Sequence, residues 1–214
     1  MGKVRFGLSM SLDGYVAGPE QSVENPLGIG GERLHDWAIK LAAWRRQHGL
    51  EGGETNASSA VVEESTANAG AYVMGRSMFG GGPGPWDEAW TGWWGDDPPF
   101  HVPVFVVTHH AREPLAMKGG TSFEFVTEGV EGAVERARAA AGEGDVVIAG
   151  GASVVQQCLV AGLVDEANVS LVPILLGGGA RLFDDLGEPP PELEQLRAVE
   201  APGVTHLKYR VAGR

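Results

Sequence analysis

The chain has 214 residues, of which 43% are hydrophobic, and its 16 lysines and arginines against 28 aspartates and glutamates give a formal net charge of −12 at pH 7. This length and composition predict one globular domain with a full core, and the acidic charge with scattered basic residues disfavours a nucleic-acid partner. The single cysteine cannot form an internal disulfide, and the absence of a membrane-spanning run and of a signal-peptide pattern predicts a cytoplasmic protein with no membrane partner.

Strand and helix patterns alternate in the first part of the chain. A strand is expected over residues 4–12, where it ends in the turn Asp13-Gly14, and a second strand over 71–74. Between these strands, apolar residues recur at helical spacing from Glu32 to His48, which predicts one amphipathic helix. A shorter helix is expected over 60–68.

Glycine, proline and tryptophan dominate residues 80–100, which predicts an ordered loop rather than a bare linker. Four of the six tryptophans lie in this loop: Trp86, Trp90, Trp93 and Trp94. Their flat side chains could wall a pocket for an aromatic ligand, or they could pin the loop to the core or make a dimer contact. The sequence leaves these interpretations open.

The second half of the chain continues the alternation. Strands are expected over 104–108, 122–126, 145–149 and 166–175, and helices over 130–141 and 153–161. Two further strands, 193–201 and 204–211, flank Pro202-Gly203 and resemble an antiparallel hairpin. The order of elements predicts an α/β fold with a mostly parallel sheet and an antiparallel end.

The strongest local signal for chemistry is the pair Gly150-Gly151, which lies between a buried strand and a helix. Adjacent glycines let a phosphate approach the backbone, and the free amides and dipole at the start of the helix favour negative charge. The pair is not a dinucleotide fingerprint, because Ala152, Ser153 and Val154 follow it. A tight strand-to-helix turn remains the alternative interpretation.

Two other strand ends carry residues suited to an anionic ligand. Arg76 and Ser77 follow the strand that ends at Gly75, and a guanidinium beside hydroxyl and amide donors suits a phosphate. Thr108, His109 and His110 follow another strand and could contact a ribose or phosphate. Two adjacent histidines without a cysteine cluster do not form a metal site, so no metal is expected.

Three carboxylates are candidates for acid-base chemistry or substrate contact. Asp13 ends the first strand in a turn where a cleft would open, and Glu63 and Glu64 precede the next strand. Each of them is also compatible with a helix cap or a solvated charge.

Five segments, taken together and in order, resemble the dihydrofolate reductase-like superfamily, in particular the reductase domain at the C-terminus of the riboflavin-pathway deaminase/reductase, RibD. The segments are SLDGYVAG at 11–18, VMGRSMF at 73–79, VFVVTHH at 104–110, VVIAGGASVVQQCL at 146–159 and GLVDEANVSLVPILLGGGARLF at 162–183. The resemblance covers nearly the whole chain. It implies a single three-layer α/β domain over residues 1–214, with helices on both faces of the sheet, an inserted loop and helix at about 19–58, and the tryptophan-rich loop at 80–100.

The resemblance also implies NADPH as cofactor, lying across the carboxyl ends of the strands. The implied cofactor-binding residues are Gly75, Arg76, Ser77, Met78, Thr108, His109, Ala149, Gly150, Gly151, Ala152, Ser153 and Val154. An unusual cis peptide bond is common at the glycine pair in this family. The loop after Asp13 would cover the nicotinamide, with Asp13 or a bound water as the proton source, and Tyr15, Trp86 and Glu64 are the expected substrate contacts.

The chain departs from its relatives at positions that concern the substrate. The riboflavin-pathway reductases typically read Asp-Gly-Lys after the first strand, whereas this chain has Tyr15 in place of the lysine. The folate enzymes carry a helix carboxylate for the pteridine, and Asp36 lies on the wrong side of the apolar stripe to be its clear equivalent. With the long insert and the tryptophan loop, these departures indicate a different substrate.

The sequence therefore predicts an NADPH-dependent oxidoreductase that transfers a hydride to a C=N, C=C or C=O bond of a small heterocyclic or aromatic molecule. The alternative is a non-catalytic protein that binds a nucleotide or sequesters a ligand, and a dihydrofolate or aminopyrimidine reductase proper is the third choice. A homodimer is also expected, from the family and from the apolar segment that includes Leu182 and Phe183.

Overall fold

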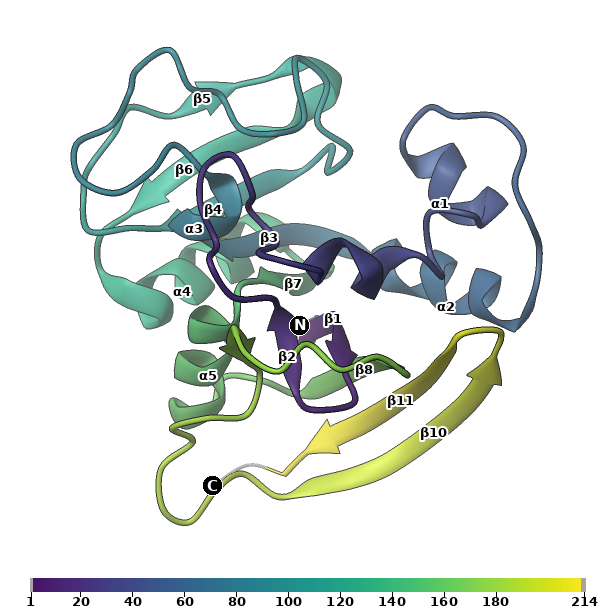
Figure 1. The fold of residues 1–214 in the computed structure, drawn as a ribbon. Coiled ribbons are helices and arrows are strands. Elements are labelled where there is room, and N and C mark those ends of the chain that lie inside the picture. Colours follow the sequence, from purple (N-terminus) through teal and green to yellow (C-terminus); the bar gives the residue numbers. More distant parts are fainter. Residues whose placement is uncertain (1, 213–214) are drawn as a thin grey trace.

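The computed structural model describes residues 2–212, and its centre is a nine-stranded sheet in the order β10-β11-β8-β1-β7-β3-β4-β6-β5 (Figure 1). The strands are β1 (Val4–Ser11), β3 (Ala69–Gly75), β4 (Pro103–Val107), β5 (Leu115–Ala116), β6 (Ser122–Val126), β7 (Asp145–Gly150), β8 (Glu166–Val172), β10 (Leu193–Ala201) and β11 (Val204–Val211). All neighbours from β8 to β6 pair in parallel, whereas β5, β10 and β11 pair antiparallel. The predicted α/β fold is confirmed.

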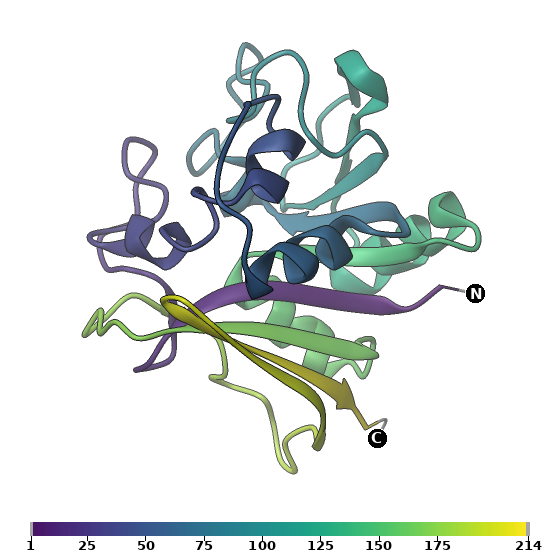
Figure 2. The ribbon, with the colours of Figure 1, turned by 90° about the vertical axis from the view of Figure 1, so that its right-hand side faces the viewer.

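Helices cover both faces of the sheet (Figures 1 and 2). The helices α4 (Gly129–Ala141) and α5 (Ala152–Val160) lie on one face, where their apolar stripes close the main core against Phe6 and Ile148. The other face carries α2 (Ala57–Thr66), α1 (Ala42–Gln47) and the 3₁₀ turn η1 (Gly31–His35). Among residues 2–212, no helix is long and apolar enough to cross a membrane.

The single helix expected from Glu32 to His48 is wrong, because the structure divides this segment into η1 and α1. Leu41 interrupts the helix with extended backbone, at ψ 136°. The backbone on either side of it pairs with Glu54, whose amide donates to the carbonyl of Lys40 and whose carbonyl accepts from Ala42, both at 2.8 Å. These tertiary hydrogen bonds replace the helical ones, and the apolar spacing alone could not reveal them.

The next helix, α2, begins earlier than expected because of its cap. The side chain of Asn56 accepts from the amide of Ser58 at 2.8 Å, and the hydroxyl of Ser59 accepts from the amide of Asn56 at 3.1 Å. This reciprocal pair satisfies amides that the first helical turn leaves free. The sequence also gave no signal for a small second sheet, formed by β2 (Tyr15–Ala17) and β9 (Ala180–Arg181), or for the short helix α3 (Arg76–Phe79).

The tryptophan-rich loop is pinned to the core. Trp86, Trp90 and Trp94 pack on a cluster that includes Phe79 and Phe123, and the indole N–H of Trp90 donates to the carbonyl of Phe79 at 3.1 Å. Trp93 is more exposed, at 37%. Of the three interpretations of this loop, the structure therefore supports anchoring on the core, where the indole rings provide apolar packing surface.

Candidate cofactor and substrate site

Three glycines form a cradle where β3 and β7 end side by side. Gly150 has φ +135°, a conformation that favours glycine, and its peptide bond to Gly151 is cis, as the family resemblance implies. A Cβ on Gly75 would lie 3.0 Å from Cγ2 of Val154 and 3.7 Å from the amide of Gly151, so β3 approaches the pair closely. A Cβ on Gly151 would meet no atom within 4 Å. The space over Gly151 is therefore open.

The helix α5 starts at this open space. Gly151 is its N-cap residue and provides no side-chain cap, so the amides of the first turn, at Ala152, Ser153 and Val154, have no intrahelical acceptor. An anion above Gly151 would meet these amides and the positive end of the helix dipole. Ala149 precedes the pair, and its half-buried methyl group packs against the cluster that contains Met74.

Two arginines lie around Trp86, and the sequence analysis singled out only Arg76, which directly follows Gly75 of the cradle. The guanidinium of Arg76 stacks on the indole of Trp86 at 3.8 Å, and that of Arg112 lies 5.3 Å from the same ring. Burial, and then the neighbouring charge of Arg112, lower the pKa of Arg76. Nε and Nη1 of Arg76 are shielded from solvent and have no hydrogen-bond partner among the described residues. Unpaired guanidinium donors in this position are suited to a phosphate group.

A turn after β4 completes this side of the site. Thr108 is buried, and its hydroxyl accepts from the amide of His110 at 3.1 Å, so its role is to shape the turn. His109 is exposed on the turn, and Ser77 is exposed on α3. The carbonyl of His110 accepts from the indole N–H of Trp86 at 2.7 Å, which ties the turn to the arginine pair. Arg112 belongs to the same turn, only four residues after Thr108, which is the signal that could have identified it.

Asp13 is a structural clamp. Its carboxylate accepts from the hydroxyl of Ser11 at 2.6 Å and from the amides of Leu176 and Gly177 at 3.1 and 2.7 Å. The hydrogen bond from Ser11 and those two backbone amides lower the pKa of Asp13 to about 2. The carboxyl group is therefore ionised near neutral pH and has no proton to deliver, which argues against the role of proton donor expected from the sequence.

The remaining substrate candidates occupy different places. Tyr15 lies on β2, with the guanidinium of Arg181 4.8 Å from its ring. Trp86 supports the arginine pair and packs on Phe79 and Phe125 rather than standing free in a pocket. Met78 lies under the cradle, with its sulfur 3.3 Å from the position of a Cβ on Gly150.

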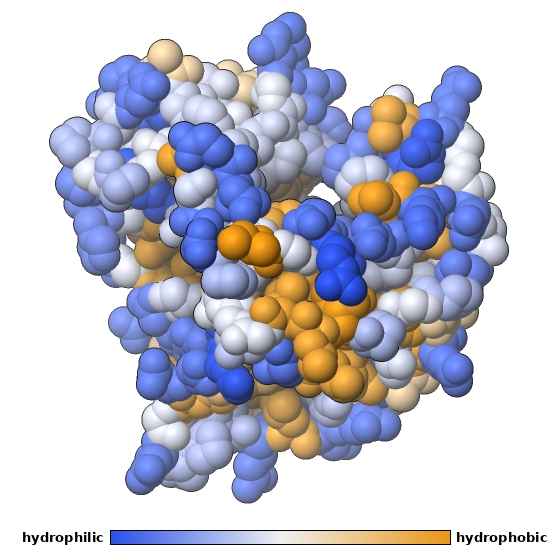
Figure 3. Space-filling model, viewed as in Figure 1, coloured by the Kyte–Doolittle hydropathy of each residue, from blue (hydrophilic) through white to orange (hydrophobic). Residues whose placement is uncertain are grey.

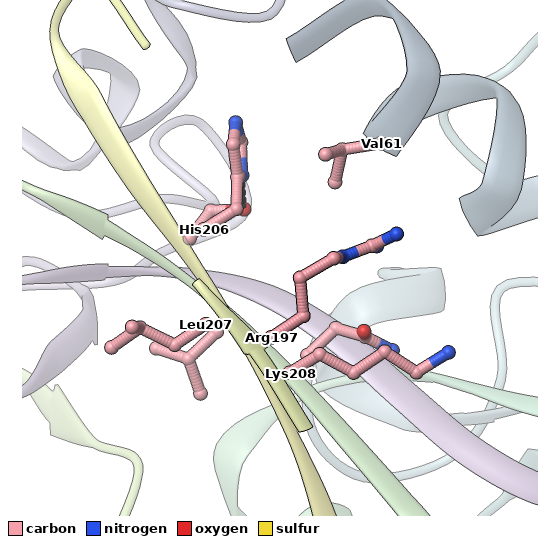
Figure 4. A pocket seen from close by; sticks show the side chains of 8 residues that line it. Val61, Arg197, His206, Leu207 and Lys208 are labelled. Atoms are coloured by element: carbon pink, nitrogen blue, oxygen red, sulfur yellow. Dashed lines mark hydrogen bonds between the residues drawn. The ribbon is translucent and has the colours of Figure 1, made fainter. Parts of the chain in front are cut away.

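Glu64 points from α2 to the C-terminal hairpin. Its carboxylate forms ion pairs with Arg197 and with Lys208, the latter at 2.8 Å, and in Figure 4 both basic side chains extend from the hairpin towards α2. The two cations lower the pKa of Glu64, although burial acts in the opposite direction. The structure thus gives Glu64 a structural partnership instead of the substrate contact expected from the sequence.

A buried polar row beside this ion pair had no signal in the sequence. His206 lies between two hydroxyls, with Nε2 2.8 Å from Oγ of Ser58 and Nδ1 2.9 Å from Oγ of Ser170. The ring of Trp37 meets His206 edge-on at 4.7 Å, and its indole N–H donates to Ser9 at 3.1 Å. Burial, and then the charge of Arg197, lower the pKa of His206 to about 4. The row fixes α2 and the segment after η1 to the sheet.

The surface of the sheet over β1 is open. Gly7 is exposed although β1 is a central strand, and Ser9 and Asn168 beside it are half-buried. Figure 3 shows the surface hollowed between the part that carries the tryptophan loop and the part that carries α1.

Within residues 2–212 no group of three metal-ligating side chains is present. Burial raises the pKa of the Cys158 thiol to about 12, which makes this thiol a poor nucleophile.

Comparison with solved structures defines the class of fold. A protein of Shewanella sp. PV-4 assigned to riboflavin biosynthesis is 21% identical, with a TM-score of 0.61, and each chain covers 99% of the other. Dihydrofolate reductase from Enterococcus faecalis, solved with NADP(H), is 14% identical, with a TM-score of 0.50 over 98% of this chain and 96% of that one. The fold is therefore that of the dihydrofolate reductase-like proteins.

A family model places the chain more closely. The model of the RibD C-terminal domain matches residues 2–207, so the chain belongs to that family. The Thermotoga maritima diaminohydroxyphosphoribosylaminopyrimidine deaminase/5-amino-6-(5-phosphoribosylamino)uracil reductase is 14% identical, with a TM-score of 0.57; the match covers 99% of this chain and 57% of that one. No curated protein matches the sequence. Family and fold together support a reductase-type function.

Proposed function

We propose that this protein is an NADPH-dependent reductase that transfers a hydride to a C=N, C=C or C=O bond of a small heterocyclic or aromatic substrate. The observation that carries the proposal is the open space over Gly151, which lies at the first turn of α5 and next to the end of β3. A pyrophosphate suits this cradle, because the free amides and the helix dipole favour negative charge there.

The arginine pair favours NADPH over NADH. NADPH carries one phosphate more, and Arg76 and Arg112 place two cations around Trp86 at the ends of β3 and β4. Burial, and then the charge of Arg112, lower the pKa of Arg76, and an anion between the two guanidinium groups would offset both effects. The exposed His109 on the adjoining turn adds a further donor.

The bound cofactor would supply the hydride, and the chain would orient the reactants and exclude water. Gly75 and Gly150 shape the backbone against which the pyrophosphate rests, while the turn 13–18 covers the end of β1. Asp13 holds that turn against Leu176 and Gly177 and acts as a positioning residue. Because its carboxylate is ionised, the proton that accompanies the hydride comes from a bound water in this proposal.

The test is the loss of NADPH absorbance across a panel of pterins, imines, quinones and enones. We expect oxidation with at least one compound and slower oxidation when NADH replaces NADPH. Cofactor binding without turnover on the whole panel would instead support the non-catalytic alternative. Turnover of dihydrofolate would identify a folate reductase proper.

We also propose that the protein forms a homodimer, although not on the ground expected from the sequence. Leu182 is fully buried within its own chain, so it cannot contribute to an interface, whereas Phe183 is 39% exposed. The edge strand β10 is a better candidate, because it pairs on one side only and exposes Leu193 and Leu196 at 44% and 39%. Sedimentation at micromolar concentration tests this proposal, and a 22.5 kDa species alone would refute it.

A further inference from the structure

A cavity of about 420 Å³ lies between η1, the start of α2 and the end of β8. Its lining residues come from three places that are distant in the sequence: Arg33, Asp36, Trp37, Lys40, Glu54, Asn56, Val172, Pro173, Ile174, Pro202 and Gly203. The volume is within the range of pockets for small ligands. Six of the lining residues belong to the insert at 19–58, so this cavity is a property of the insert rather than of the sheet alone.

The cavity combines an apolar floor with a charged rim. Trp37, Val172 and Ile174 are buried or half-buried and provide the floor, next to Pro173 and Pro202. The rim carries two cations and two carboxylates, and all four side chains are exposed: Arg33, Lys40, Asp36 and Glu54. In the part of the chain that the structure describes, none of these four forms an ion pair or a side-chain hydrogen bond.

The cavity lies at the same edge of the sheet as the glycine cradle. Its floor residue Val172 is the register partner of Ser11, the last residue of β1, and β1 lies between β8 and β7. The amide of Leu12 donates to the carbonyl of Ile174 at 2.9 Å. Two strand spacings, about 10 Å, therefore separate the end of β8 from the end of β7. Ligands of open α/β sheets bind at this edge.

We infer that this cavity holds the substrate of the proposed reductase, and that the substrate is a flat ring that carries both an anionic and a cationic substituent. That the ligand is a substrate rests on the proposed function. The class of ligand rests on the cavity itself. The ring lies on the floor formed by Trp37, Val172 and Ile174. The anionic substituent meets Arg33 or Lys40, and the cationic one meets Asp36 or Glu54.

The balance of charge on the rim decides between ligand classes. A purely anionic ligand would gain from the two cations but would be repelled by the two carboxylates and by the overall charge of −12. A purely cationic ligand would gain from the two carboxylates but would be repelled by the two cations of the rim. A ligand with both charges can pair with one cation and with one carboxylate of the rim at the same time. Asp36 lies at the rim of the cavity, beside Trp37. The sequence pattern placed it away from the apolar stripe.

Four probes that share one ring test the class of ligand: benzoate, benzylamine, para-(aminomethyl)benzoate and benzyl alcohol. Dissociation constants are measured by ligand-observed NMR on the full chain without NADPH. Because an exposed ion pair contributes up to about 1 kcal/mol, each charge should tighten binding by about threefold, and the zwitterion should bind about tenfold tighter than the alcohol. Equal binding of all four probes, or no binding, would overturn the inference.

Paired variants locate the binding site. The double variant Arg33→Met/Lys40→Met should remove the advantage of the carboxylate and leave that of the amine, and Asp36→Asn/Glu54→Gln should do the reverse. Lys118→Met is the matched control, because Lys118 is an exposed lysine that pairs with Asp96 and does not line the cavity. If the control lowers binding of the zwitterion as much as Arg33→Met/Lys40→Met does, the probes bind elsewhere and the inference fails.

A kinetic arm separates this inference from the proposed function. For any compound that the NADPH-oxidation panel shows to be a substrate, para-(aminomethyl)benzoate should raise the KM and leave kcat unchanged. Inhibition that lowers kcat alone would place the cavity outside the substrate site. If the zwitterion binds as expected but no compound is reduced, the reductase proposal fails. The cavity is then a binding site for a zwitterionic ring that is not a substrate.

Discussion

The substitution Gly151→Ala separates cofactor binding from folding. Gly151 has φ −81°, which alanine adopts without strain, and its new Cβ would meet no atom within 4 Å. We therefore expect the free energy of unfolding to change by less than about 0.5 kcal/mol, or to rise slightly because alanine restricts the unfolded chain. The methyl group would nevertheless occupy the space over the first turn of α5, where the pyrophosphate is proposed to rest.

The expected loss of binding follows from the hydrogen bonds that a displaced phosphate would give up. A hydrogen bond to a charged group contributes about 1.5 to 3 kcal/mol, so the loss of a single amide contact weakens NADPH by about tenfold or more. Isothermal titration with NADPH measures this loss, and thermal unfolding without ligand measures stability on the same sample.

Neighbouring glycines supply the controls for this prediction. Gly150→Ala should lower stability as well as binding, because φ +135° strains alanine and its Cβ would lie 3.3 Å from the sulfur of Met78. Gly75→Ala should also lower stability, through the contact of 3.0 Å with Val154. If Gly151→Ala binds NADPH normally, the pyrophosphate lies elsewhere, and if it unfolds, the glycine pair is only a structural turn.

Three further predictions concern charged groups. Replacing Arg76 or Arg112 by alanine should weaken NADPH more than NADH, by about tenfold for one charged hydrogen bond, and equal losses in titrations with both cofactors would remove the arginine pair from the phosphate site. Asp13→Asn should abolish the part of the acid destabilisation that wild type shows between about pH 4 and pH 2, because the pKa of Asp13 is lowered from 3.8 to about 2 and its stabilisation disappears as pH falls through that window; identical denaturant midpoints for both proteins across this window would contradict it. The pKa of His206 is lowered from 6.5 to about 4, so the unfolded chain takes up the proton at a higher pH than the folded one. The free energy of unfolding should therefore fall by up to about 3 kcal/mol between pH 6.5 and pH 4. In urea titrations, His206→Gln should reduce this dependence on pH.

Much of the fold could be predicted because its signals are local. The hairpin strands 193–201 and 204–211 and the strand 122–126 have the bounds that the sequence indicated, since turn residues and β-rich runs mark their ends. The segment after Glu32 could not be predicted, because the backbone pairing of Leu41 with Glu54 is a tertiary contact. A regular apolar spacing is compatible with a helix whether or not such a contact interrupts it.

In the candidate site, too, some features could be predicted from the sequence and others could not. Gly150, Gly151 and Arg76 follow strands directly, so their position at the carboxyl edge could be inferred from the sequence. The state of Asp13 could not, because its pKa depends partly on the amides of Leu176 and Gly177, more than 160 residues away. The role of Glu64 was hidden for the same reason, since both of its cations come from the C-terminal hairpin.

The insert and the loop after β8 connect the two parts of the proposed site. Asp13 ties the turn after β1 to Leu176, and the segment 173–174, just before it, forms part of the floor of the cavity. A displacement of the turn that covers the cofactor would therefore also move a wall of the cavity. Because the half-buried carboxylate at the end of β1 accepts from three donors, Ser11, Leu176 and Gly177, its constant negative charge suits this connection better than a titrating acid would. Tyr15 stands on that turn where the riboflavin-pathway reductases typically carry a lysine, and the proposed substrate site lies instead at Trp37 and its charged neighbours in the insert.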